Sequence, residues 1–154
     1  MVEWKKICCA VDFSEGSEAA LELAADLARR FGAQLTVLHV YQPPHTAIPV
    51  EGAVYVPQDF FESMAEKVTQ QLADWKRRAE KRSEGSVTAT MLSGVPFAEI
   101  TRYAKEAKLD LIVMGTEGRT GLRHLFLGSV AERVVRLADC PVLTVRPKKS
   151  GKAE

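Results

Sequence analysis

Five short apolar runs alternate with longer amphipathic segments along this chain of 154 residues, and that order limits the possible folds. The runs predicted as strands are 7–11, 35–40, 87–92, 110–114 and 142–145. The segments predicted as helices are 14–31, 59–82, 96–107 and 130–138. Gly32 would end the first of these helices, and Asp59 with Glu62 would form a capping-box-like start of the second. Continuous apolar strands separated by helices are typical of a parallel sheet covered on both faces. We therefore expect an α/β fold, a three-layer open parallel five-stranded sheet with helices on both faces.

A glycine-rich segment joins the fourth predicted strand to the last predicted helix. It contains Gly115 and Gly118, then nine residues, and then Gly128 followed by Ser129. Glycines let backbone N–H groups approach an anion, and a helix start adds unpaired N–H donors and the positive end of a dipole. Neither a Walker P-loop nor a Rossmann dinucleotide fingerprint is present. The segment predicts a phosphate or nucleotide site, although glycines can also simply make turns.

Charge and hydropathy narrow the possible partners. The chain has 21 Lys and Arg against 20 Asp and Glu, a formal net charge of +1. A nucleic-acid-binding surface needs a clustered excess of basic residues. No apolar run approaches membrane-spanning length, and the N-terminus lacks the apolar segment of a signal peptide. We therefore expect a cytoplasmic protein with neither a nucleic acid nor a membrane as partner.

The three cysteines do not indicate a metal site. Cys8, Cys9 and Cys140 form no CxxC pair, and no paired His spacing accompanies them. Cys8 and Cys9 are adjacent on a predicted strand, so they should face opposite sides of the sheet. We expect small buried hydrophobic residues.

Several segments together resemble the universal stress protein family. The spacing of Gly115, Gly118, Gly128 and Ser129 is similar to the ATP-binding motif of that family. The other segments that carry the likeness are 7–17, 35–40, 94–115 and 140–145. The resemblance covers nearly the whole chain except the Pro-rich segment 41–58. That segment is long for a connection within a domain, so we expect a lid, a binding loop or an interface there.

The resemblance implies a fold, a cofactor and partners. The fold would be Rossmann-like, of the adenine nucleotide alpha hydrolase kind, as one domain over 1–147 with a flexible tail at 148–154. The cofactor would be ATP, with Mg²⁺ held through the phosphates, because the chain keeps the whole motif of the nucleotide-binding branch. The partners would be a second copy, paired through the last strand, and a regulatory protein that the sequence does not identify.

The expected ligand-binding residues follow from the resemblance and from their places at strand ends. They are Ala10, Val11, Asp12, Val40, Met114, Gly115, Gly118, Arg119, Gly128, Ser129 and Val130. Ala10 and Val11 would wall the adenine pocket, with Met114 packing nearby. Val40 would offer its backbone N–H and C=O to the adenine edge. For Val40 and Met114, ordinary core packing is the alternative interpretation.

The polar members of this set each have a competing role. Asp12 would bind the ribose or a magnesium ion shared with phosphates, or it would cap the following helix, with Ser14 as a rival cap. Ser129 would bond a phosphate oxygen, or it would form a capping box with Glu132. Arg119, together with the nearby loop residues Arg123 and His124, would contact the terminal phosphate or a partner, or would be a solvated loop charge.

These features favour an ATP-binding regulatory protein of the stress response, in which occupancy orders the glycine-rich loop and a partner recognises the result. The alternative is a slow Mg-dependent ATP hydrolase that uses Asp12, Arg119 and His124. Efficient catalysis is not expected, since the chain has no Walker lysine and no dedicated base. A further alternative is an adaptor that does not use nucleotide. An electron-transfer-flavoprotein-like domain is less favoured, because the chain is short and shows no flavin-binding region.

Overall fold

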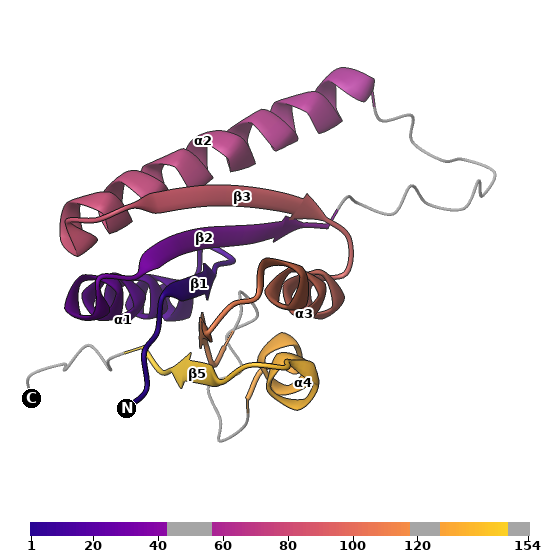
Figure 1. Cartoon of the computed structure of the whole chain (residues 1–154). Coiled ribbons are helices and arrows are strands. Elements are labelled where there is room, and N and C mark those ends of the chain that lie inside the picture. The colour runs from indigo at the N-terminus through magenta and orange to yellow at the C-terminus, as the bar shows by residue number, and fades with distance from the viewer. Residues whose placement is uncertain (43–56, 118–126, 148–154) are drawn as a thin grey trace, which may run out of the picture.

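The computed structural model describes residues 1–42, 57–117 and 127–147, which form a layered α/β fold (Figure 1). The strands are β1 (Lys6–Ala10), β2 (Gln34–Tyr41), β3 (Val87–Ser93), β4 (Leu111–Gly115) and β5 (Val142–Val145). The helices are α1 (Glu15–Phe31), α2 (Gln58–Ser83), α3 (Pro96–Ala107) and α4 (Ser129–Leu137). Every predicted strand and helix is present, with its ends close to the predicted ones.

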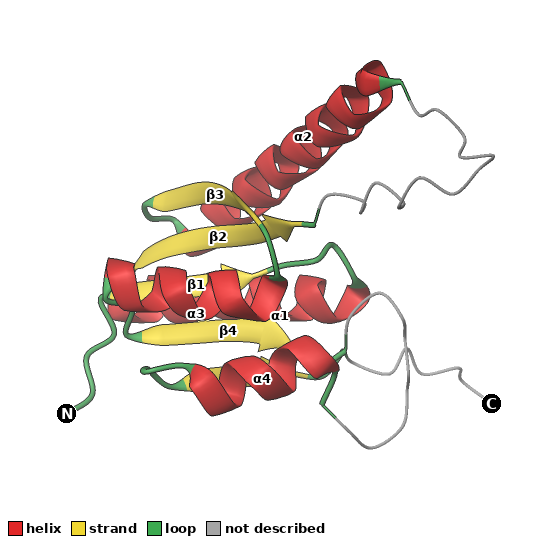
Figure 2. Ribbon diagram, turned by 90° about the vertical axis from the view of Figure 1, so that its right-hand side faces the viewer, coloured by secondary structure: helices red, strands yellow, loops and turns green. Residues whose placement is uncertain are grey.

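The five strands form one sheet in the order β3-β2-β1-β4-β5, and every neighbouring pair is parallel. Figure 2 shows β3, β2, β1 and β4 one below the other. The central strand β1 pairs with both β2 and β4, so that Ile7 lies between Leu35 and Leu111. The chain runs outward from β1 through β2 to β3 and then crosses to β4 on the other side. This reversal places a topological switch point between β1 and β4, where ligands of open α/β sheets bind.

Helices cover both faces of the sheet, which confirms the predicted fold class. One buried cluster joins β1, β2 and β4 to α1 and α2, with Leu21 and Trp75 among its members. The second cluster joins the opposite face to α3 and α4, with Ile100 and Val134 among its members. Parallel strands are buried on both faces in such a fold, and their side chains alternate between the two clusters.

Cys8 and Cys9 show this alternation directly. Both side chains are fully buried and free of disulfides, and they belong to opposite clusters, as the sequence predicted. Burial raises the pKa of both thiols above its ordinary value, because the thiolate form is the one that loses its hydration.

The ends of α1 follow known capping rules. The side chain of Ser14 accepts a hydrogen bond from the Ser17 N–H at 3.2 Å, so Ser14 is the N-cap. At the other end Gly32 adopts a left-handed conformation with φ of 62°, and its N–H bonds the carbonyls of Ala28 and Arg29. Gly32 therefore ends the helix as the sequence predicted.

The predicted start of α2 is wrong in its details. The expected capping box of Asp59 and Glu62 is not formed, because the helix begins one residue earlier with Pro57 in the capping position. Proline offers no side-chain acceptor for the first turn. Glu62 instead accepts a hydrogen bond from the Gln58 side chain at 3.2 Å.

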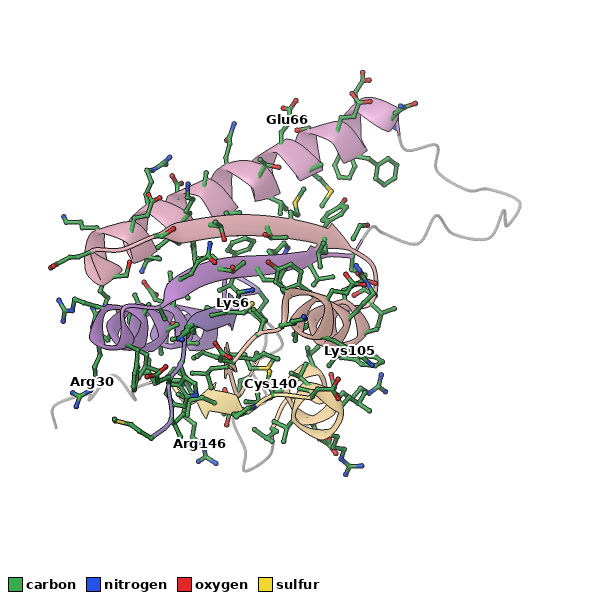
Figure 3. The ribbon with its side chains drawn as sticks, in the orientation of Figure 1. Lys6, Arg30, Glu66, Lys105, Cys140 and Arg146 are labelled. Atoms are coloured by element: carbon green, nitrogen blue, oxygen red, sulfur yellow. The ribbon has the colours of Figure 1, made fainter. Side chains whose placement is uncertain are left out.

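Charged side chains occupy the outer surfaces of the layers. Arg30 of α1, Glu66 of α2 and Lys105 of α3 are all exposed and are labelled in Figure 3. No helix within the described ranges has both the length and the apolar character needed to cross a bilayer.

Candidate functional site

A cavity of about 290 Å³ lies at the carboxyl ends of β1, β2 and β4, bordered by α3 and α4. Nine of the predicted ligand-binding residues line it, namely Ala10, Val11, Asp12, Val40, Met114, Gly115, Gly128, Ser129 and Val130. The other two, Gly118 and Arg119, lie outside the described residues, as do Arg123 and His124. The cavity has the size and the switch-point location typical of a small-ligand site.

Asp12 organises the turn between β1 and α1. Its Oδ1 accepts hydrogen bonds from the Ser14 N–H at 3.0 Å and from the Ser17 hydroxyl at 2.7 Å. The same Ser17 hydroxyl accepts from the Asp12 N–H at 2.9 Å. The sequence left two candidates for the cap of α1, Asp12 and Ser14, and the structure places Ser14 in that role. Asp12 braces the turn and lines the cavity.

The end of β4 and the start of α1 approach each other at two glycines. A Cβ on Gly115 would lie 2.7 Å from the carbonyl carbon of Gly16, and a Cβ on Gly16 would lie 3.0 Å from the Glu117 carbonyl oxygen. Real side chains are not accommodated at such separations without movement of the backbone. Gly115 is therefore required by packing, whether or not a ligand is bound.

The start of α4 differs from the prediction. The expected capping box of Ser129 and Glu132 is wrong, because Gly128 holds the capping position. The Gly128 N–H donates to the Thr116 carbonyl at 2.6 Å, and the Gly128 carbonyl accepts from the Glu132 N–H at 2.9 Å. These two bonds fix where the helix begins. Ser129 is the first residue of α4, and its side chain is exposed.

Thr116 connects this helix start to the edge of the sheet. Its N–H donates to the carbonyl of Val145, the last residue of β5, at 3.0 Å. Its carbonyl accepts from Gly128. One buried residue thus joins the end of β5 to the first turn of α4 beside the cavity.

His39 contributes a buried polar side chain to the cavity wall. It lies in β2 with 7% of its surface exposed, and its Nδ1 is 2.8 Å from the carbonyl oxygen of Val11. A carbonyl oxygen can only accept, so Nδ1 carries the hydrogen in this bond. The His39 ring also packs on the Phe13 ring, with 4.5 Å between their centroids.

The walls of the cavity are mostly apolar, with side chains such as Leu38, Ile100 and Ala131. Its described lining includes two carboxylates, Asp12 and Glu117, and no lysine or arginine. Within the described residues, no three His, Cys, Asp or Glu side chains are grouped as a metal site. An anion here would be held by backbone N–H groups, by the start of α4, and by a cation shared with a carboxylate.

A comparison with protein families decides the identity. Residues 3–146 match the model of the universal stress protein family. The chain belongs to that family. A universal stress protein of Methanocaldococcus jannaschii is 38% identical over 151 residues, covering 95% of this chain and 85% of that protein.

Solved structures agree with the assignment to the universal stress proteins. The universal stress protein UspA from Lactobacillus plantarum is similar with a TM-score of 0.81 and 26% identity, covering 95% of this chain and 100% of that one. The universal stress protein from Archaeoglobus fulgidus in complex with dAMP is similar with a TM-score of 0.63 and 25% identity, covering 94% of this chain and 99% of that one.

Among the residues at or beside the cavity that the sequence did not predict, Gly16, His39 and Thr116 have structural roles. Gly16 could have been identified from the sequence, since a glycine in the first turn of a helix lowers helix stability and therefore indicates a packing or functional constraint. His39 was detectable too, as a polar residue within the apolar run 35–40. Thr116 acts through backbone hydrogen bonds to residues distant in the sequence, and no sequence pattern predicts such bonds.

Proposed function

We propose that this universal stress protein binds ATP with Mg²⁺ in the cavity at the carboxyl ends of β1, β2 and β4 and acts as a homodimeric regulatory switch. The observation that carries the proposal is the convergence of nine residues, predicted from the sequence for nucleotide binding, on one cavity at the switch point of the sheet. The Archaeoglobus fulgidus relative in complex with dAMP supports an adenine nucleotide as the ligand.

The two ends of the cavity suit the two ends of a nucleotide. Apolar walls at Val11, Val40 and Met114 would enclose the adenine ring. Gly128 and Ser129 lie at the start of α4, where unpaired N–H groups and the helix dipole favour phosphate oxygens. The Ser129 hydroxyl is not the cap of α4, so in this arrangement it can donate to a phosphate.

Asp12 fits the role of a magnesium ligand. Its carboxylate lines the cavity, and Mg²⁺ in nucleotide sites takes one or two carboxylates together with phosphate oxygens. When bound, the ion would offset the repulsion between the phosphates and the carboxylates of Asp12 and Glu117. Ribose binding by Asp12 is the alternative within the same proposal.

Pairing through β5 would form the dimer. This strand lies at the edge of the sheet, and all four of its residues are half-buried. An edge strand presents a row of backbone N–H and C=O groups that a strand of a second copy can pair with. Thr116 connects the end of β5 to the start of α4 through backbone hydrogen bonds. The proposed dimer edge would therefore be linked through this one residue to the end of the cavity proposed for the phosphates.

The substitution Ser129→Asp tests this arrangement, because it should affect folding and binding in opposite directions. An acidic residue at the first position of α4 interacts favourably with the helix dipole, by roughly 0.3–1 kcal/mol. The same carboxylate would repel phosphates and weaken Mg-ATP binding by about tenfold or more. The matched control is Gln58→Asp, which makes the same kind of change at the first residue of α2. Calorimetric titration of both variants with Mg-ATP is the measurement, and equal affinity for the two would contradict the proposed phosphate position.

A further inference from the structure

The carbonyl of Val11 marks the point where the β1 ladder ends beside the cavity. The Val11 N–H still donates to the backbone carbonyl of Leu38 at 2.8 Å. The Val11 carbonyl accepts instead from a side chain, Nδ1 of His39. Val11 is 5% exposed and His39 is 7% exposed, so this bond is buried. A buried carbonyl without a donor is costly, and His39 therefore continues the β1–β2 pairing by one further bond.

The residue after Asp12 is held in an unusual backbone conformation. Phe13 has a φ of 66°, in the left-handed region that residues with a Cβ rarely adopt. Its ring packs against the rings of His39 and of Trp75 in α2, with 4.5 Å and 5.3 Å between the ring centroids, respectively. Such conformations persist where the surroundings over-determine them, and they concentrate at functional sites.

These contacts enclose Asp12. Val11 before it is bonded to His39, Phe13 after it is packed on His39, and Ser17 beyond it is bonded to its carboxylate. Asp12 itself lines the cavity. The position of its carboxylate relative to a ligand therefore depends on a turn that His39 contacts at two points.

We propose that His39 is a positioning residue of the nucleotide site, which holds the 11–14 turn through its Nδ1–H bond to the Val11 carbonyl and its contact with Phe13. This inference rests on the proposed nucleotide function. His39 acts through the turn and not by reacting with the ligand. The bond needs a donor at the Nδ1 position, and an asparagine side chain can supply an amide N–H at that place.

Three variants test the role of His39 by calorimetric titration with Mg-ATP. His39→Leu removes the donor and should weaken binding by about tenfold, because the 11–14 turn and the Asp12 carboxylate would lose their fixed position. His39→Asn restores a donor and should bind within about threefold of wild type. Thr36→Val is the matched control, because Thr36 lies in the same strand, is equally buried and bonds Thr88 at 3.0 Å away from the cavity. It should keep wild-type affinity even where it costs stability.

A spectroscopic readout accompanies the affinities. Nitrogen-15 NMR of the histidine rings in the wild-type protein should show His39 protonated at Nδ1. Protonation at Nε2 alone would overturn the inference, and so would wild-type affinity in His39→Leu or equal weakening in His39→Asn. Wild-type protein that binds no adenine nucleotide would overturn the proposed function itself, and the positioning role with it.

Discussion

Gly16 and Gly115 meet backbone to backbone, so that the first turn of α1 rests directly on the carboxyl end of β4. A Cβ on Gly115 would come within 2.7 Å of the Gly16 carbonyl carbon and 3.1 Å of the Ser17 nitrogen. The contact brings the Asp12 turn and the end of β4 together at one edge of the cavity. The first glycine of the glycine-rich segment thus has a structural role that does not depend on a ligand.

Replacing Gly115 by alanine should therefore destabilise the ligand-free protein. The new methyl group meets backbone atoms that cannot rotate away, and overpacking of this kind costs about 1–3 kcal/mol. Gly85→Ala is the matched control, since its nearest contact would be at an ordinary 3.6 Å, and its stability should stay within about 1 kcal/mol of wild type. Urea unfolding of the two variants without nucleotide is the measurement. Equal stability would show that the Gly16 contact is not constraining.

The bidentate pair between Asp26 and Arg82 predicts a pH effect. Arg82 donates to both carboxylate oxygens at 2.8 Å, and this hydrogen bonding holds the pKa of Asp26 below its ordinary value. A carboxyl with a lowered pKa in the folded state stabilises the protein above its unfolded-state pKa, and that contribution is lost as the pH falls through the folded-state pKa. The pair is partly exposed, so the effect should be modest.

An NMR titration of the Asp26 carboxyl checks this pair. Arg82→Gln should raise the pKa of Asp26 toward its ordinary value, because the guanidinium charge and its bidentate contact with the carboxylate are both lost. Lys81→Gln removes the same charge from the neighbouring position and should leave that pKa nearly unchanged. A pKa that moves equally in both variants would mean that general charge, and not the bidentate contact, sets it.

The cysteines should differ in reactivity in the native state. Cys140 is half-buried, whereas Cys8 and Cys9 are fully buried. Burial raises the pKa of all three thiols, and the thiolate is the reactive form. Alkylation at neutral pH followed by peptide mass spectrometry should therefore find Cys140 modified first and Cys8 and Cys9 modified only on unfolding. Early labelling of Cys9 would contradict the buried core position.

The same thiols predict a loss of stability in alkali. A thiol with a raised pKa in the folded state stays protonated there while the unfolded chain ionises, so stability falls as the pH rises above about 9. Cys9→Ala should flatten this fall, measured as urea midpoints between neutral and alkaline pH. An unchanged slope would assign the alkaline loss to other groups.

The proposed dimer predicts different outcomes for the same change at the two edges of the sheet. Thr144 lies in β5 and Thr90 in β3, and both are half-buried. A lysine in an edge strand opposes pairing with another strand. Thr144→Lys should shift the protein toward monomer in light scattering, while Thr90→Lys should not. Dimers that persist in Thr144→Lys, or monomers in both variants, would contradict pairing through β5.

The sequence predicted the fold well because the apolar runs and helical spacings are strong and agree with each other. The sequence predicted residues of the cavity lining where they lie at strand ends or in the glycine-rich segment, as at Asp12, Val40 and Gly128. The errors occurred where the decisive contact is not local. Ser129 reads as a cap, yet Thr116 bonds Gly128 and moves the helix start. His39 reads as part of an apolar strand, because its partner Val11 lies 28 positions earlier in the chain, just after the end of β1.

We expect Mg-ATP to occupy the cavity at the carboxyl ends of β1, β2 and β4. Backbone amide NMR of the nitrogen-15-labelled protein, titrated with Mg-ATP, tests it most directly. We expect saturable shifts concentrated at the amides of Asp12, Val40, Gly115, Gly128 and Ser129, with small changes at distant sites such as Glu66. No shifts at nucleotide concentrations found in cells, or shifts centred away from these amides, would contradict it.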